Sequence, residues 1–322
     1  MLSDVLFLVL GMGLLLGGGD SLVRGASALA HRLGISPLVV GLTVVAFGTS
    51  APELAVNVAG ALSGAGEISF GNVMGSNIAN VALVIGAVAV LRPIGIERAV
   101  IVREIPMMTL AAIAAAVMGL DHLFDRGALG DRYSRADGVM FLLLFGVFLY
   151  YTCNDALRQR ESAQGAPQTE GHMAIGLAVV WVVLGLVGLV LGGHWTVSSA
   201  SSLALQLGVS QTVVGLTVVA VGTSLPELVT SLVGVLRGAD SLAVGNVVGS
   251  NIFNLLFVLG TTSVIRPVPV PSLGAWDLGM VILVSVALLP LAFNRTRCVG
   301  RSGGLLLLAA YFGYMTWRSL QG

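Results

Sequence analysis

The sequence predicts an all-α polytopic membrane protein with ten transmembrane helices in two inverted five-helix repeats. First, 56% of the 322 residues are hydrophobic and only 10% are charged, whereas ordinary soluble domains contain roughly 25% charged residues. Second, the apolar runs extend for about twenty residues, the length of a membrane-crossing helix, rather than the roughly ten of an outer-membrane strand. Third, a long segment of the first half recurs in the second.

The apolar runs define ten predicted spans. The first, 5–33, follows Asp4 rather than a basic stretch and has no convincing cleavage site, so we interpret it as a retained span. The polar stretch 154–172 indicates a solvated, non-helical linker that separates the halves 1–153 and 173–322. The other spans are predicted at 37–62, 68–91, 99–120, 137–153, 173–205, 211–236, 242–265, 276–294 and 303–318.

The internal repeat aligns residues 41–93 with 215–267 at a constant offset of 174, with 29 of the 53 positions identical. Each half contains five spans. Because five is odd, the second half enters the bilayer from the opposite side, so the repeats are predicted to be inverted. Inverted repeats are typical of secondary transporters, which bind substrate near the midplane where the halves meet.

The distribution of arginine predicts the orientation. With the N-terminus on side one, ten Arg residues fall in side-two loops and five in side-one loops, three of the five in the loop 121–137 beside four Asp. Cytoplasmic loops carry the excess of basic residues. The linker is therefore predicted to be cytoplasmic, and both termini to be outside.

Several function classes lack the residues that they need. All sixteen basic residues are Arg and none forms a dense cluster, so nucleic-acid binding is unsupported. Cys153 and Cys298 have no metal-binding spacing and are interpreted as unpaired, and the four scattered His residues include no HExxH motif. Without a paired nucleophile and base, an enzyme is not expected.

Glu53 and Glu227 lie inside apolar spans at equivalent repeat positions. A carboxylate near the bilayer centre costs at least about 2.5–3.5 kcal/mol, and such residues usually face a cavity and bind something. The alternative is a structural Glu that caps a helix break or pairs with a buried Arg. The duplication, and the absence of an Arg at matching depth, favour binding.

Each Glu closes a polar stripe. Positions 0, 3, 4 and 7 share one helix face, and the preceding Pro52 and Pro226 remove an N–H donor, bending the helix and freeing the carbonyl of Gly48 or Gly222. A second stripe in the next span is spaced by four; interhelical hydrogen bonding is its alternative role. The first stripe comprises Ala46, Thr49, Ser50 and Glu53, repeated as Ala220, Thr223, Ser224 and Glu227; the second comprises Asn72, Ser76 and Asn80, repeated as Asn246, Ser250 and Asn254.

Carboxylate, hydroxyl, amide and backbone oxygens are the ligands of a hard cation, Ca²⁺ or Na⁺. Two carboxylates neutralise one divalent ion, and monovalent ions can occupy the same oxygens. Mutually exclusive binding with alternating access would then give exchange.

These motifs resemble those of the cation/Ca²⁺ exchanger family, specifically its prokaryotic Na⁺/Ca²⁺ exchangers, whose two alpha-repeats carry GTSxPE and GNxxGSN signatures. The signatures stand here at 48–53 and 71–77, and again at 222–227 and 245–251. The resemblance covers all ten spans and identifies 41–93 and 215–267 as the alpha-repeats. It implies a multi-pass protein of a prokaryotic inner membrane.

The resemblance also implies ligand roles. Glu53 and Glu227 would be the main Ca²⁺ ligands, and Thr49, Thr223 and the carbonyls of Ala46 and Ala220 would share coordination of Ca²⁺ or Na⁺. Na⁺ ligands would be Ser50, Ser76, Ser224 and Ser250. Asn80 and Asn254 occupy the last polar position of each repeat, where many relatives carry Asp, so direct Ca²⁺ ligation by Asn254 is less secure and a K⁺-dependent subtype is disfavoured.

In the family, the pair of helices corresponding to the first and sixth spans slides against the rest. Those two spans are long and glycine-interrupted here, and Asp20 and Arg24, spaced by four, are expected to pair with each other. The linker is too short for the regulatory Ca²⁺-sensing domains of some animal relatives.

The sequence thus predicts an antiporter that exchanges Na⁺ for Ca²⁺, with no cofactor, functioning as a monomer in the lipid bilayer. The alternative is a Ca²⁺/H⁺ antiporter of the same fold, in which the two Glu residues alternate between Ca²⁺ and protons. The duplicated hydroxyl stripe favours Na⁺, because hydroxyls ligate Na⁺ but have no role in proton exchange. A passive cation channel, the alternative from another class, would show flux without a counter-ion gradient.

Overall fold

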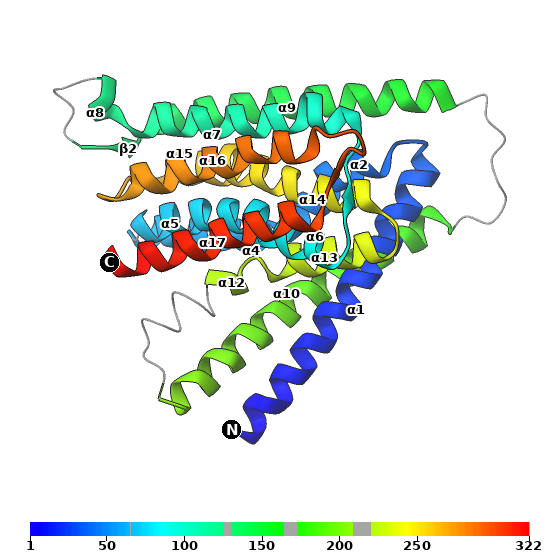
Figure 1. Cartoon of the computed structure of the whole chain (residues 1–322), viewed down its shortest axis with the longest axis horizontal. Helices are drawn as coiled ribbons and strands as arrows, with labels where there is room; N and C mark the ends of the chain where they lie inside the picture. Colours follow the sequence, from blue (N-terminus) through cyan, green and yellow to red (C-terminus); the bar gives the residue numbers. More distant parts are fainter. Residues whose placement is uncertain (65, 125–129, 164–172, 209–219, 322) are drawn as a thin grey trace.

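The computed structural model describes residues 1–64, 66–124, 130–163, 173–208 and 220–321, which are overwhelmingly helical (Figure 1). Among them, seven helices are long and apolar enough to cross a membrane, or eight if one bent pair counts as a single span. The all-helical class is confirmed. The count of ten and the division into two five-helix repeats stay predictions.

The first half begins with α1 (Leu2–Leu33) and a bent second span. A third span combines α5, η2 and α6, a fourth combines η3 and α7, and the half ends in the long α9. The second span consists of α2 (Pro37–Val40), the π-helical η1 (Gly41–Val45), α3 (Ala46–Thr49) and α4 (Ala51–Ser63); the rest are α5 (Gly66–Ile78), η2 (Ala79–Ile85), α6 (Gly86–Leu91), η3 (Val100–Glu104), α7 (Ile105–Gly119), α8 (Asp121–Phe124) and α9 (Arg135–Ala163).

The second half follows the same order. Predicted spans 173–205 and 211–236 correspond to α10 and to α12 with α13, although 211–219 lie outside the described residues. The elements are α10 (Ile175–Gln206), α12 (Ala220–Gly222), α13 (Leu225–Leu236), α14 (Asp240–Ile252), the π-helical η5 (Phe253–Val258), α15 (Leu259–Ile265), α16 (Gly274–Ala292) and α17 (Arg301–Gln321).

Two short antiparallel strand pairs, which the sequence did not predict, tie loops together. β1 (Ile94–Gly95) pairs with β4 (Cys298–Val299), and β2 (Arg132–Tyr133) pairs with β3 (Val268–Pro269). Each pair joins a loop of the first half to a loop of the second. Hydrogen-bonded backbone at these loops therefore fixes how the halves meet.

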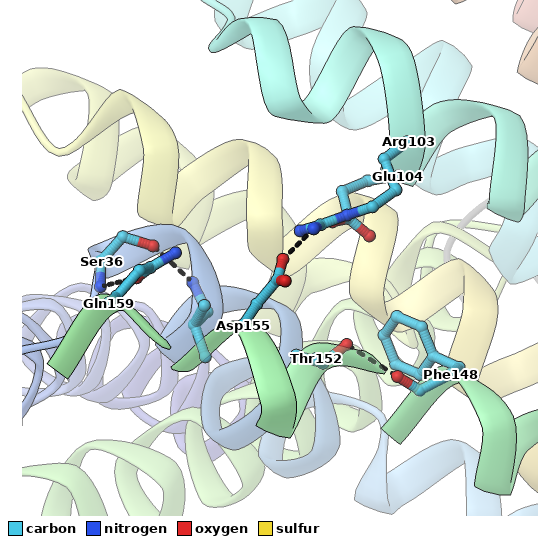
Figure 2. A network of polar contacts seen from close by, with 8 residues as sticks. Ser36, Arg103, Glu104, Phe148, Thr152, Asp155 and Gln159 are labelled. Carbon is cyan, nitrogen blue, oxygen red and sulfur yellow. Dashed lines mark hydrogen bonds and ion pairs between the residues drawn. The ribbon is translucent and has the colours of Figure 1, made fainter. Parts of the chain in front are cut away.

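The prediction of a non-helical linker from residue 154 is wrong for its first part, because α9 continues to Ala163. Good helix formers fill this extension, and its side chains have tertiary partners. Asp155 forms an ion pair with Arg103, and the side-chain oxygen of Gln159 accepts a hydrogen bond of 2.8 Å from the backbone N–H of Ser36 (Figure 2). Residues 164–172 lie outside the described residues.

Helices α1 and α10 pack against each other and run obliquely to the main array of helices (Figure 1). Their backbones approach so closely that a Cβ on Gly18 would lie 2.8 Å from Leu189 N, and one on Gly185 would lie 2.5 Å from Leu22 N. Glycine permits such close packing in membrane helices. The two oblique helices therefore form one closely packed pair.

The principal core lies within the main array. Its buried side chains include Ile78, Val84, Met108, Val248 and Leu255, contributed by α5, η2, α7, α14 and η5. Helix α14 is buried along nearly its whole length. The third span of each half thus lies at the centre of the array, beside the polar stripes described next.

Candidate cation-binding site

The second span of each half is interrupted just before the helix that carries its Glu residue. The axes of Pro37–Thr49 and Ala51–Ser63 differ by 43°, with Ser50 at the break, and Ser224 lies between α12 and α13. Pro52 and Pro226 stand in the first turn of α4 and α13, where proline is well accommodated because its missing N–H has no helical partner. The bend expected at Pro52 is present.

The breaks place Glu53 in the first turn of α4 and Glu227 in the first turn of α13. A carboxylate is favoured at a helix N-terminus, because the helix dipole presents its positive end there. The Glu53 side chain is 1% exposed and that of Glu227 is 0% exposed. The same local rule, applied in each half, therefore buries one negative group from each half.

Neither carboxylate has a hydrogen-bonded or ion-pair partner among the described residues. All four carboxylate oxygens lack a hydrogen bond, and none of the ion pairs involves either residue. The structural alternatives, a cap or a buried Arg pair, are thus not realised in this part of the chain. Glu53 lies close to Ser76, and Glu227 lies close to Glu53 and Thr49.

The first stripe of one half meets the second stripe of the other. The Thr49 hydroxyl donates to the side-chain oxygen of Asn246 at 3.0 Å and lies 3.3 Å from the Ser250 hydroxyl. Asn246 in turn donates to Ser231 at 3.3 Å. The interhelical role considered for the Asn and Ser stripe is therefore present at Asn246, and the same contact brings the two stripes together, whereas cation binding by the stripe stays a prediction.

Several other predicted ligands also have buried polar atoms without a partner among the described residues. Asn80 and Asn254 are 1% and 0% exposed, and neither amide group has a hydrogen-bond partner in the described residues. Each lies in the π-helical segment that follows α5 or α14. Other unpartnered atoms are the hydroxyls of Ser50, Ser76 and Ser224 and the side-chain nitrogen of Asn72.

The other predicted residues differ in burial and position. Ala46 is fully buried at the start of α3, Thr223 and Asn72 are half-buried, and Ala220 begins α12, its side chain lying outside the described residues. Asp20 and Arg24 are paired at 2.9 Å, as expected, and Asp20 also contacts Arg237.

Sequence reasoning missed Asn77 and Asn251, the last residues of the two GNxxGSN motifs. Both are 0% exposed, and both side-chain oxygens lack a partner in the described residues. Their occurrence at equivalent positions of the two repeats is the sequence signal that could have identified them. They fall on a different helix face from the second stripe, so the spacing of four passed over them.

The donor set fits a hard cation. No group of three or more His, Cys, Asp or Glu side chains converges anywhere in the described part of the chain. The site therefore offers two carboxylates and neutral oxygens, which suits Ca²⁺ or Na⁺ rather than a softer metal. Buried polar atoms without partners cost free energy, and a bound cation offsets that cost for the oxygens.

The sequence of the chain matches a known protein family. The family model described as sodium/calcium exchanger protein matches residues 3–154 and 177–320. The chain belongs to the sodium/calcium exchanger family. It is therefore related to transporters rather than to enzymes, and the family, like the apolar helices, indicates an integral membrane ion transporter.

Full-length relatives of this exchanger-family chain include the putative antiporter CaxA of Alkalimonas amylolytica, 39% identical, with 98% of each chain covered. The sodium/calcium exchanger MaX1 of Methanosarcina acetivorans is 32% identical, with 97% of each covered. The inner membrane protein YrbG of Escherichia coli is 34% identical, covering 99% of this chain and 97% of its own length.

Among solved structures, the sodium-calcium exchanger NCX_Mj soaked with Na⁺ and Ca²⁺ has a TM-score of 0.83 and 31% identity, with 98% of each chain covered. This chain therefore shares the overall fold of that sodium-calcium exchanger.

Proposed function

We propose that this protein is a secondary active antiporter that exchanges Na⁺ for Ca²⁺ by alternating access at one shared midplane site. The observation that carries the proposal is the pair of buried carboxylates, one from each half, whose oxygens have no partner among the described residues. Two negative charges balance one Ca²⁺ ion. Na⁺ ions would compete for the same oxygens together with neighbouring hydroxyl and amide oxygens.

In the proposed site, Glu53, Glu227, Thr49 and Thr223 hold Ca²⁺, and the carbonyls of Ala46 and Ala220 complete the coordination. Na⁺ would use serine hydroxyls as well. Support comes from the contact between Thr49 and the Asn246–Ser250 stripe, which joins the two halves at the carboxylates. The serine and amide ligands are Ser50, Ser76, Ser224, Ser250, Asn80 and Asn254, with Asn72, Asn246, Pro52 and Pro226 in supporting roles.

The proposed topology has two inverted halves, 1–153 and 173–322, joined on the cytoplasmic side, with both termini outside and the monomer as the functional unit. An inner-membrane protein and an archaeal membrane protein are among the relatives. The arginine asymmetry supports the orientation.

Uptake of radioactive Ca²⁺ into Na⁺-loaded proteoliposomes tests the function. We expect uptake when the liposomes are diluted into Na⁺-free buffer and none when Na⁺ is equal on both sides. Uptake driven by a pH gradient alone would instead establish Ca²⁺/H⁺ exchange. Uptake that needs no counter-ion gradient would indicate a channel and contradict both.

A further inference from the structure

The two ends of the site differ, although the repeat makes them equivalent. At one end, Thr49 and Asn246 are 1% and 0% exposed and are joined by their 3.0 Å hydrogen bond. The counterparts at offset 174 are Thr223 and Asn72. Both are described and half-buried, no equivalent hydrogen bond joins them, and the side-chain nitrogen of Asn72 has no partner among the described residues.

These ends point to opposite membrane faces in the proposed topology. Asn72 lies one turn closer to the α4–α5 connection than Ser76, and Asn246 lies one turn closer to the α13–α14 connection than Ser250. We call the membrane face at the α4–α5 connection face A, and the face at the α13–α14 connection face B. The hydrogen-bonded end of the site is directed toward face B.

The described residues near the two faces also pack differently. At face A, Ala61 and Arg266 line a cavity of about 510 Å³. The equivalent positions at face B are Val235 and Arg92, and there Arg92 donates a hydrogen bond to the Val235 carbonyl. Val235 and Ser231 also line a separate cavity of about 10 Å³ between the helices.

We propose that the Thr49–Asn246 hydrogen bond closes the site toward face B, and that an equivalent Thr223–Asn72 hydrogen bond closes it toward face A when the protein faces the other way. Asn246 and Asn72 are then positioning residues that set the balance between the two states. In the state described here, Thr49 is held by Asn246 while Thr223 is released. The inference rests on the proposed antiport function and its inverted topology.

The two states are balanced because each makes the same number of Thr–Asn hydrogen bonds. Each state makes one Thr–Asn bond across the halves and leaves the equivalent one open, so the two states keep similar free energies. Removing one Asn destabilises only the state that uses it. A net hydrogen bond shifts an equilibrium by about fivefold.

The test measures the apparent KM for Ca²⁺ from each face, in right-side-out and inside-out vesicles. When only the state open to a face binds from that face, apparent affinity scales with the population of that state. Asn246→Ala weakens closure toward face B, so a fivefold shift between two similarly populated states should lower the KM from face B by slightly less than about twofold. Asn72→Ala is its matched counterpart, and the opposite shift should raise the KM from face B by about threefold.

Ser231→Ala provides a second variant should Asn246→Ala fold poorly. It removes the hydroxyl that accepts the Asn246 side-chain N–H at 3.3 Å, so the KM from face B should fall by a smaller factor. Equal changes in Asn246→Ala and Asn72→Ala, or no change in either, would overturn the proposal. Failure of the antiport function itself looks different, because wild-type protein would then show no Na⁺-dependent Ca²⁺ flux from either face.

Discussion

Asn251 donates a hydrogen bond of 3.2 Å from its side-chain amide to the backbone carbonyl of Asn77, the residue that stands at the equivalent position of the other repeat. The offset of 174 residues found in the sequence is therefore also a point of physical contact. Asn77 uses its own amide locally, donating to Val73 at 2.7 Å. The equivalent residues thus have different partners, and only Asn251 bonds across the halves through its side chain.

We predict that Asn251→Ala destabilises the protein by about 1 kcal/mol more than Asn77→Ala, because it removes a buried bond between the halves. Asn77→Ala loses only a bond within its own helix and retains the carbonyl that accepts from Asn251. Thermal unfolding in detergent, followed by size-exclusion fluorescence, measures both. Equal losses would show that the bond between the halves contributes no more than the local one.

Glu53→Gln and Glu227→Gln should each abolish Ca²⁺ transport without lowering thermal stability. The replaced carboxylates are buried and have no partner in the described residues. Gln removes a buried charge, so stability without Ca²⁺ should be unchanged or higher. Stabilisation by added Ca²⁺ should disappear, since it requires binding to the folded state.

The measurement is thermal unfolding with and without Ca²⁺, together with uptake in proteoliposomes. Ser285→Ala is a control variant, because its buried hydroxyl bonds only to Val281 in its own helix. Normal uptake by either Gln variant would refute the site assignment.

Arg103→Ala should destabilise the protein more than Asp155→Ala. Arg103 pairs with Glu104, whose side chain is 2% exposed, at 2.6 Å, and with Asp155, which is 24% exposed (Figure 2). Losing Arg103 leaves the buried Glu104 without its ionic partner, at a cost of about 1–3 kcal/mol. Losing Asp155 removes a solvent-screened pair worth about 1 kcal/mol or less.

Chemical denaturation of the two variants provides the comparison. The double variant Arg103→Ala/Glu104→Gln should recover part of the loss, because the buried charge is removed as well. Without such recovery, the cost of Arg103→Ala would have to come from its packing.

Gly119→Ala should destabilise the protein by about 1–3 kcal/mol through overpacking. A Cβ at position 119 would lie 2.5–2.7 Å from atoms of the Tyr133 ring. Tyr133 is fully buried, and its hydroxyl donates to the Ala115 carbonyl at 2.9 Å, so the ring cannot move freely.

Thermal unfolding of Gly119→Ala and of the double variant Gly119→Ala/Tyr133→Leu tests this interpretation. The smaller side chain should make the added methyl group nearly neutral relative to Tyr133→Leu alone. Gly176→Ala is the control, because a Cβ there meets nothing within 4 Å. A large loss at Gly176 would indicate a backbone effect instead.

Much of the fold was accessible from the sequence because hydrophobicity and backbone breaks are local properties. The described residues of the predicted spans are mostly helical, although the count of ten membrane crossings stays a prediction, and the break before Glu53 follows from Pro52. Less was accessible where a segment is polar yet packed. The polar composition of residues 154–163 predicts a linker. In the structure, Asp155 and Gln159 bond to residues of other elements, and the helix continues to Ala163.

The sequence by itself determined the membrane class, the duplication and the two equivalent polar stripes, because apolar period and repeat offset are properties of the chain. Only the tertiary structure decided how the stripes pair: Thr49 bonds to Asn246, whereas their counterparts Thr223 and Asn72 do not bond to each other. Two segments that share 29 of 53 residues, including the polar stripes, predict two equivalent ends. The packing of one half against the other breaks that equivalence, since a hydrogen bond depends on the relative position of both halves and not on either segment alone.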